Sequence, residues 1–62
     1  MPIAIIHLME GRDDQKKARA IEAVTKALVE TLEVKAESVR VLLVEVPWAS
    51  WGIAGKPASE RR

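Results

Sequence analysis

Pro2, which directly follows Met1, is the residue of this chain whose chemistry depends most on its position. Cells usually trim methionine from a Met-Pro start, and trimming leaves a free secondary amine at the first residue of a strand. With cations nearby, such an amine can act as a general base near neutral pH. A purely structural role is the alternative, since a proline at the start of an edge strand loses no needed N–H.

Two arginines are placed where they could bind an anion. Arg12 follows Gly11 at the end of the first expected strand and beside the start of a helix, a location that suits anions. An ordinary surface arginine is the alternative there. Arg40 lies mid-strand, on a face whose other residues are apolar: Leu42, Val44 and Val46. If it is buried, its guanidinium needs either a carboxylate of a neighbouring subunit or an anionic ligand.

The remaining candidates have structural and functional interpretations side by side. Trp48 and Trp51 are the only aromatic residues, and each could fill a core or interface or wall an apolar pocket. His7 stands alone within an apolar strand, which is typical of a structural histidine. Glu10 and Glu45 could act as acids or bases, but their spacing does not select them. Without cysteine or a cluster of ligands, we expect no metal and no cofactor.

The hydrophobic pattern predicts the elements that position these residues. Residues 2–9 alternate as a strand that is apolar on both faces. Residues 13–32 read as a helix, with Asp13 as its N-cap and apolar side chains at spacings of three and four. Residues 39–46 form a second strand, and residues 53–54 a brief extended piece of a C-terminal hairpin. The order predicts an α/β fold, one βαβ unit with parallel strands and a right-handed crossover.

Length and composition restrict what such a unit can do alone. The chain has 62 residues, 48% of them hydrophobic, with no Cys, Phe or Tyr and a net charge of +1. We expect a single domain over residues 1–62, too small to bury a large core. One helix covers only one face of a two-stranded sheet, so the pattern predicts a chain that is stable only as an oligomer.

The same composition bears on partners and location. A net charge of +1 gives no general reason to expect nucleic acid or an anionic membrane as a partner. The apolar N-terminal run stops at Leu8 and Met9, which is too short to span a membrane. We therefore expect a cytoplasmic protein.

Taken together, the ordered segments resemble the 4-oxalocrotonate tautomerase family. The start Pro2-Ile-Ala-Ile-Ile-His-Leu-Met-Glu-Gly-Arg12 looks like the start of these enzymes, and two further segments match: Ser38-Val39-Arg40-Val41 and Trp51-Gly52-Ile53-Ala54-Gly55. The resemblance covers nearly the whole chain. It implies a cofactor-independent isomerase that catalyses 1,3-proton transfer on an unsaturated 2-hydroxy or 2-oxo acid, such as 2-hydroxymuconate from aromatic hydrocarbon catabolism. It also implies self-association, as a homohexamer built as a trimer of dimers.

The resemblance assigns roles residue by residue. Pro2 falls on the general base, Arg40 on the arginine that stabilises the dienolate, and Arg12 on the arginine that holds the distal carboxylate. Trp51 holds the place of an aromatic residue, commonly Phe, that lines the pocket. The two arginines of one site are expected to come from different subunits.

The sequence leaves two other interpretations of the function open. A hydratase, dehalogenase or decarboxylase on the same scaffold is one of them, although no Asp or Glu lies between Pro47 and Ser59 to activate water. A non-catalytic oligomeric binding protein is the other, and it would not need a free amine at Pro2.

Overall fold

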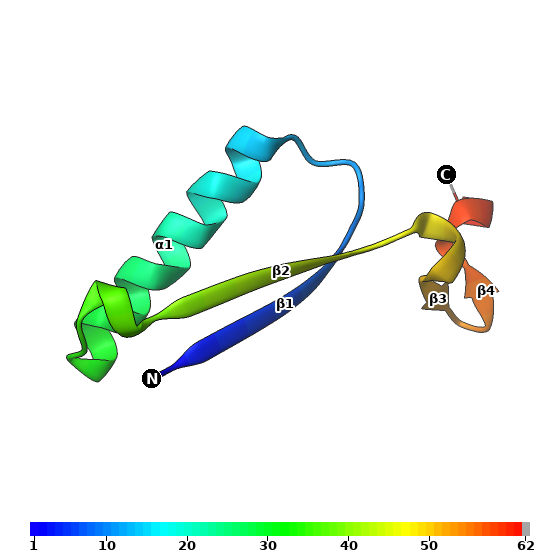
Figure 1. The fold of residues 1–62 in the computed structure, drawn as a ribbon. Helices are drawn as coiled ribbons and strands as arrows, with labels where there is room; N and C mark the ends of the chain where they lie inside the picture. Colours follow the sequence, from blue (N-terminus) through cyan, green and yellow to red (C-terminus); the bar gives the residue numbers. More distant parts are fainter. Residues whose placement is uncertain (62) are drawn as a thin grey trace.

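The chain folds as a strand, a helix and a parallel strand, followed by a small C-terminal segment (Figure 1). A computed structural model describes residues 1–61. Strand β1 spans Ile3–Met9, helix α1 spans Asp14–Leu32 and strand β2 spans Arg40–Val46. β1 and β2 pair in parallel, which confirms the predicted βαβ unit.

Helix α1 begins where its N-cap predicts. Asp13 has extended backbone angles, and its Oδ1 accepts a hydrogen bond of 2.7 Å from the backbone N–H of Lys16. This bond satisfies one of the amide groups that the first turn leaves without a partner. At the other end, Glu33 adopts a left-handed conformation with φ 55°, which ends the helix after Leu32.

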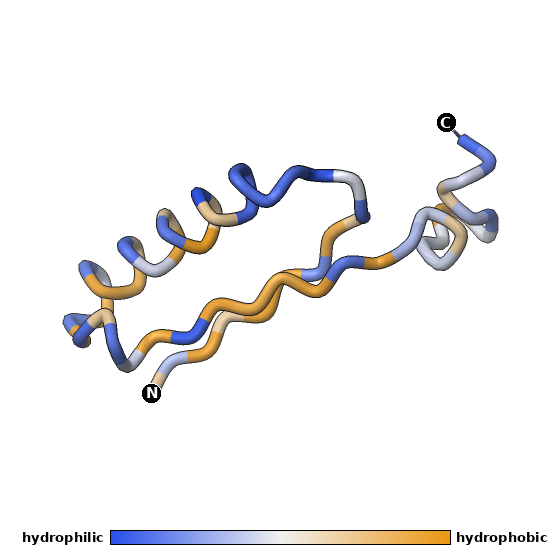
Figure 2. Tube along the Cα trace, turned by 45° about the horizontal axis from the view of Figure 1, so that its top comes forward, coloured by the Kyte–Doolittle hydropathy of each residue, from blue (hydrophilic) through white to orange (hydrophobic). Residues whose placement is uncertain are grey.

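The register of the sheet determines which side chains share a face. Ile3 pairs with Arg40 and the pairing continues to Met9 with Val46. Lys17 of α1 reaches Glu45, so the helix covers the face that also carries Val41, Leu43 and their β1 partners. Both strands are largely apolar, with His7, Arg40 and Glu45 as the exceptions, whereas the helix alternates between polar and apolar residues (Figure 2). One apolar face of the sheet is therefore left without a helix.

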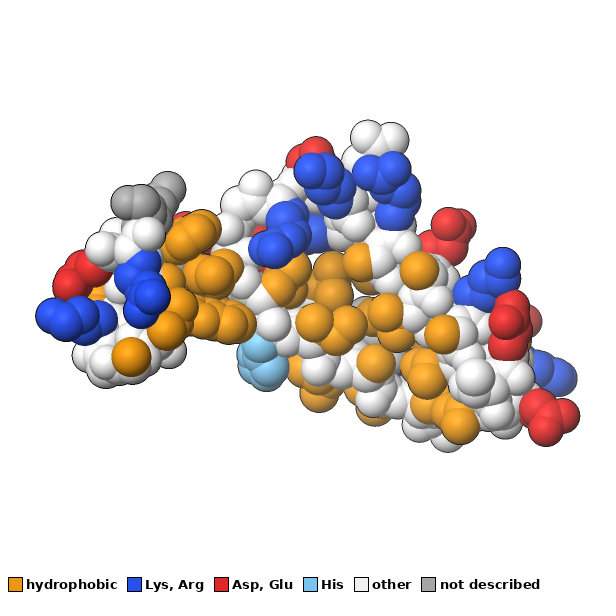
Figure 3. Space-filling model, turned by 180° about the vertical axis from the view of Figure 1, so that it is seen from behind, with side chains coloured by type: hydrophobic (Ala, Val, Ile, Leu, Met, Phe, Trp, Pro, Cys, Tyr) orange, Lys and Arg blue, Asp and Glu red, His pale blue; other side chains and the backbone are white. Residues whose placement is uncertain are grey.

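That uncovered face is exposed to solvent in the isolated chain. Its aliphatic side chains retain large exposed fractions: Ile3 60%, Ile5 58%, Leu42 46% and Val44 38%. Among residues 1–61, only Val39 and Ala58 are buried. Hydrophobic side chains accordingly form broad patches on the molecular surface (Figure 3). One chain thus does not enclose a core of its own, which supports the expectation of self-association.

The C-terminal segment is a short hairpin between two 3₁₀ turns. Strands β3 (Gly52–Ile53) and β4 (Lys56–Pro57) pair antiparallel, flanked by turns at Trp48–Ser50 and Ala58–Arg61. Gly55 has a φ of 87° in the connecting loop, a conformation that glycine adopts without steric cost. The segment lies beyond the end of β2 and stands apart from α1 (Figure 1). The predicted C-terminal hairpin is confirmed.

No helix in residues 1–61 has the length and apolar character needed to cross a bilayer.

Candidate active site

Pro2 and Arg40 lie side by side at one end of the sheet. The backbone N–H of Arg40 donates a 3.0 Å hydrogen bond to the carbonyl oxygen of Pro2, and Arg40 pairs with Ile3 in the register. Pro2 is half-buried, whereas Met1 keeps 77% of its surface exposed. The Met1–Pro2 bond is thus at an accessible chain end, and removal of Met1 would leave the Pro2 amine next to the start of β2.

Arg40 differs from its predicted placement. The predicted mid-strand position of Arg40 is wrong, because β2 begins at Arg40. The sequence left the burial of its guanidinium open, and in the single chain the residue is exposed. The reason is that its register partner Ile3 lies on the face opposite α1, where no other element covers it. Its face had been predicted correctly, with Leu42 and Val44 as neighbours.

The Arg40 side chain is nevertheless held in place. Its Nη1 donates to the carbonyl oxygens of Glu37, at 2.6 Å, and Val39, at 3.2 Å. Arginine has five N–H donors, and among the described residues no group accepts from its Nε or Nη2. This side of the guanidinium can bind a carboxylate through two parallel hydrogen bonds.

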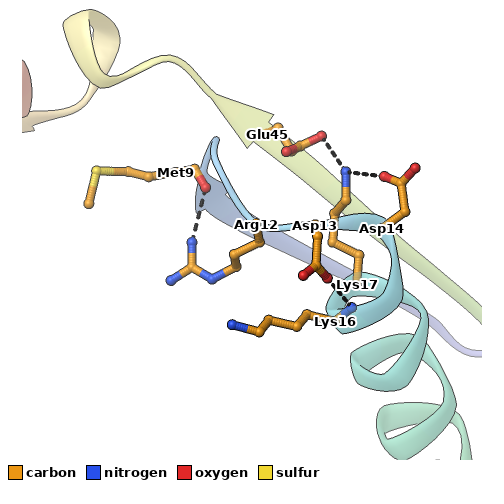
Figure 4. A network of polar contacts seen from close by, with 7 residues as sticks. All are labelled: Met9, Arg12, Asp13, Asp14, Lys16, Lys17 and Glu45. Atoms are coloured by element: carbon orange, nitrogen blue, oxygen red, sulfur yellow. Dashed lines mark hydrogen bonds and ion pairs between the residues drawn. The ribbon is translucent and has the colours of Figure 1, made fainter.

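Arg12 occupies the opposite end of β1. Its Nη1 donates a 3.0 Å hydrogen bond to the carbonyl oxygen of Met9, the last residue of the strand (Figure 4). It precedes the first turn of α1, as predicted, but the carboxylate of Asp13 already caps that turn. A ligand anion at this place would therefore depend on the guanidinium of Arg12 more than on the helix N-terminus.

A single chain keeps these residues apart. β1 has seven residues, Ile3–Met9, and a strand rises about 3.3 Å per residue, so its ends are about 20 Å apart. Pro2 and Arg40 lie at one end and Arg12 at the other, with Trp51 in the segment beyond β2. A small carboxylate cannot contact Pro2 and Arg12 of the same chain. If Arg12 and Pro2 act on one ligand, a second copy has to supply one of them.

Trp51 and His7 have different surroundings in the isolated chain. Trp51 is half-buried, and its backbone carbonyl accepts a 2.7 Å hydrogen bond from the amide of Ala58, which ties the hairpin to the last 3₁₀ turn. His7 is exposed and pairs with Val44 on the uncovered face. Neither side chain contacts Pro2 within one chain.

Two features of the structure were not predicted from spacing. Trp48 donates from its indole Nε1 to the carbonyl oxygen of Glu10 at 3.2 Å, across 38 positions of sequence. The only signal for this bond in the sequence is that half-buried indole groups usually find an acceptor.

The second feature is a cluster of charges at the start of α1. Lys17 lies 3.0 Å from Glu45 and 3.2 Å from Asp14 (Figure 4). The hydrogen bond to Glu45, and then that to Asp14, raises the pKa of Lys17 above its ordinary value. The ion pair with Glu45 fastens the first turn of the helix to β2.

Comparisons with known proteins bear on this arrangement. A family model described as "Tautomerase enzyme" matches residues 2–61. The 2-hydroxymuconate tautomerase of Comamonas testosteroni is 47% identical over 60 residues, which cover 97% of this chain and 95% of that protein. Two solved structures are also similar.

The first is TomN, a 4-oxalocrotonate tautomerase homologue in the tomaymycin biosynthetic pathway. It superposes with a TM-score of 0.94 and 41% identity, over 98% of this chain and 94% of that one. The second is a heterohexamer 4-oxalocrotonate tautomerase from Chloroflexus aurantiacus J-10-fl, with a TM-score of 0.93 and 31% identity over all of both chains.

Proposed function

This chain belongs to the tautomerase enzyme family and is an isomerase, and we propose that it converts 2-hydroxymuconate into its keto form with Pro2 as the general base. The family membership and the tautomerase fold were both predicted from the sequence, and both are confirmed. The substrate is proposed from the name of the Comamonas testosteroni relative, 2-hydroxymuconate tautomerase. We propose that residues 1–62 form one tautomerase domain.

The backbone bond between Pro2 and Arg40 carries the assignment of the base. It places Pro2 beside the first residue of β2, Arg40, whose guanidinium is held by the carbonyl oxygen of Glu37. Cationic neighbours and an apolar environment both disfavour the protonated amine, so the free base is available near neutral pH. The amine then takes the proton from the enol hydroxyl and returns it to carbon, which leaves the keto acid.

The arginines take complementary parts. We assign Arg40 to the end of the substrate that carries the 1-carboxylate and the 2-oxygen, where a fixed cation stabilises the charge of the dienolate. We assign Arg12 to the distal carboxylate, which suits a guanidinium that stays charged and binds in a bidentate manner. Because about 20 Å separates the ends of β1, each site takes Arg12 from a different copy than the one that supplies Pro2.

This division of the site makes activity depend on assembly. We propose a homohexamer, arranged as a trimer of dimers, in which the uncovered face meets other copies and Trp51 lines the pocket. The exposed aliphatic side chains of that face and the related heterohexamer from Chloroflexus aurantiacus support a hexameric assembly. The cytoplasmic location expected from the sequence stays a prediction.

The test is the ketonisation of 2-hydroxymuconate by protein whose intact mass shows that Met1 is absent. Loss of the enol absorbance in the ultraviolet reports the rate. We expect a kcat/KM within about two decades of the diffusional ceiling of about 10⁸–10⁹ M⁻¹s⁻¹. Pro2→Ala should remove most of this activity, while Lys26→Ala, which changes an exposed residue of α1, should retain it.

Either of two results would overturn the proposal. If Pro2→Ala keeps a near-normal kcat, Pro2 is not the base. If the Met1-free enzyme is slow with 2-hydroxymuconate but fast with another unsaturated acid, the scaffold serves a related reaction such as hydration, dehalogenation or decarboxylation. Binding of a dicarboxylate without turnover would favour a non-catalytic oligomer.

A further inference from the structure

The turn that carries Arg12 is bonded to the segment that follows β2 through Trp48. The indole Nε1–H of Trp48 donates a 3.2 Å hydrogen bond to the carbonyl oxygen of Glu10, the first residue after β1. The amide of Glu10 in turn donates a 3.0 Å bond to the carbonyl oxygen of Val46, at the end of β2. Both backbone polar groups of Glu10 are thus held by β2 and the residues that follow it.

Arg12 lies between this anchor and a second one. Asp13 is held as the N-cap of α1 by the 2.7 Å bond from Lys16. Between Glu10 and Asp13, the backbone is free to change direction at Gly11, whose φ of 120° is in a region that glycine enters readily. The backbone at Gly11 also has open space beside it, because nothing lies within 4 Å of the position that a Cβ there would take. The orientation of the peptide after Glu10 therefore depends on the bond from Trp48.

The Arg12 guanidinium depends on the same local geometry. Its Nη1 donates to the carbonyl oxygen of Met9, which immediately precedes Glu10. If the Glu10 carbonyl is released, rotation about Gly11 moves the Arg12 backbone relative to this acceptor. The guanidinium then samples several positions, and a carboxylate binds more weakly because binding has to order the Arg12 side chain.

We propose that Trp48 is a positioning residue for Arg12, and that it sets the preference of the enzyme for substrates with a distal carboxylate. This inference rests on the proposed function, because it takes Arg12 as the group that binds that carboxylate. In this role Trp48 contacts no reacting atom. Its indole N–H acts through the Glu10 carbonyl and the turn at Gly11.

The first experiment removes the N–H and keeps an aromatic ring, in the variant Trp48→Phe. One hydrogen bond of ordinary strength corresponds to about a three- to tenfold effect, so we expect KM for 2-hydroxymuconate to rise by about that factor. kcat should stay the same, since the bond orders the binding group equally in the ground and transition states. The kinetics with phenylenolpyruvate, which has no distal carboxylate, should not change.

Two further variants separate positioning from general destabilisation. Thr31→Val is the matched control: it also removes a side-chain hydrogen bond to a backbone carbonyl, that of Ala27 at 2.7 Å, but at the distant end of α1. Thr31→Val should leave kcat and KM for both substrates unchanged. In an Arg12→Ala background, Trp48→Phe should have no additional effect on 2-hydroxymuconate, because the group it positions is gone.

A second measurement follows hydrogen exchange in the unmodified enzyme and uses a variant only to assign the signal. The Trp48 indole N–H should exchange with solvent more slowly when an unreactive dicarboxylate saturates the site. Its NMR signal is assigned by its absence in the Trp48→Phe spectrum, or by elimination against a Trp51→Phe spectrum. An equivalent monocarboxylate should not slow the exchange, because coupling between the two sites is reciprocal and runs through Arg12.

The outcomes distinguish this inference from the proposed function. If wild-type enzyme does not ketonise 2-hydroxymuconate, the proposed function fails first. If the wild type is active and Trp48→Phe slows both substrates equally, or neither, the positioning role is wrong. An indole exchange rate that is the same with and without the dicarboxylate would overturn it as well.

Discussion

Introducing a charge on the uncovered face of the sheet should dissociate the assembly, and the substitution Ile5→Lys tests this. The exposed fractions of the four aliphatic side chains are 60% for Ile3, 58% for Ile5, 46% for Leu42 and 38% for Val44. Covering them is equivalent to burying about two whole aliphatic side chains. At about 1.5–3 kcal/mol for each side chain, this contributes about 3–6 kcal/mol per chain to association.

Ile5→Lys removes about 1–2 kcal/mol of that contribution. The buried, unpaired ammonium group costs several kcal/mol more. Because about 1.4 kcal/mol corresponds to a tenfold change in an equilibrium constant, a total of about 4 kcal/mol raises the dissociation constant about a thousandfold. Sedimentation velocity over a wide range of protein concentrations measures this shift directly.

The control places the same charge on the solvent side of the helix. Ala23→Lys changes an exposed residue of α1 and should leave the association unchanged. Under the proposed function each site takes Arg12 from a second copy, so loss of assembly should also sharply lower the turnover of 2-hydroxymuconate. An Ile5→Lys variant that sediments like the wild type at every concentration would refute this prediction, and so would a dissociated chain that keeps the wild-type turnover of 2-hydroxymuconate.

Three further predictions concern single side chains. Arg40→Ala should lower kcat more than Arg12→Ala does, and steady-state kinetics in which the order is reversed would exchange their roles. Asp13→Ala should lower the free energy of unfolding by about 1 kcal/mol through loss of the N-cap, with Asp13→Asn as a control that keeps it; equal denaturant midpoints for the two variants would contradict this. Because the hydrogen bond that Lys17 donates to Glu45 raises the pKa of Lys17, the stabilisation is complete below the ordinary lysine pKa of about 10.4 and is lost as the pH rises through the higher folded-state value. The difference in Tm between wild type and Lys17→Met should therefore be constant from neutral pH to about pH 10 and shrink above that; a difference that persists in strong alkali would count against the ion pair.

Much of the fold could be predicted from the sequence because its signals are local. The N-cap of α1 uses Asp13 and an amide three residues later, so both partners are visible in one short stretch. The alternation of side chains along a strand follows from backbone geometry alone, and it placed Arg40 on the correct face. Its exposure could not be predicted, because burial depends on which face the helix covers.

The candidate residues of the site could be named but not placed. Pro2 and Arg40 are neighbours because two distant strands pair in a particular register, which the alternation of either strand leaves undetermined. The bond from Trp48 to Glu10 likewise joins segments 38 positions apart. Such contacts depend on how the elements pack.

The sequence by itself determined the elements, the apolar faces and the types of residue that could do the chemistry, because capping, side-chain periodicity and charge are properties of neighbouring residues. Only the tertiary structure decided that Pro2 and Arg40 share one end of the sheet while Arg12 lies at the other. The physical reason is that strand pairing sets positions over about 20 Å, a distance that no local interaction spans. The same pairing leaves one sheet face uncovered, and it keeps Pro2 and Arg12 of one chain too far apart to share a small ligand.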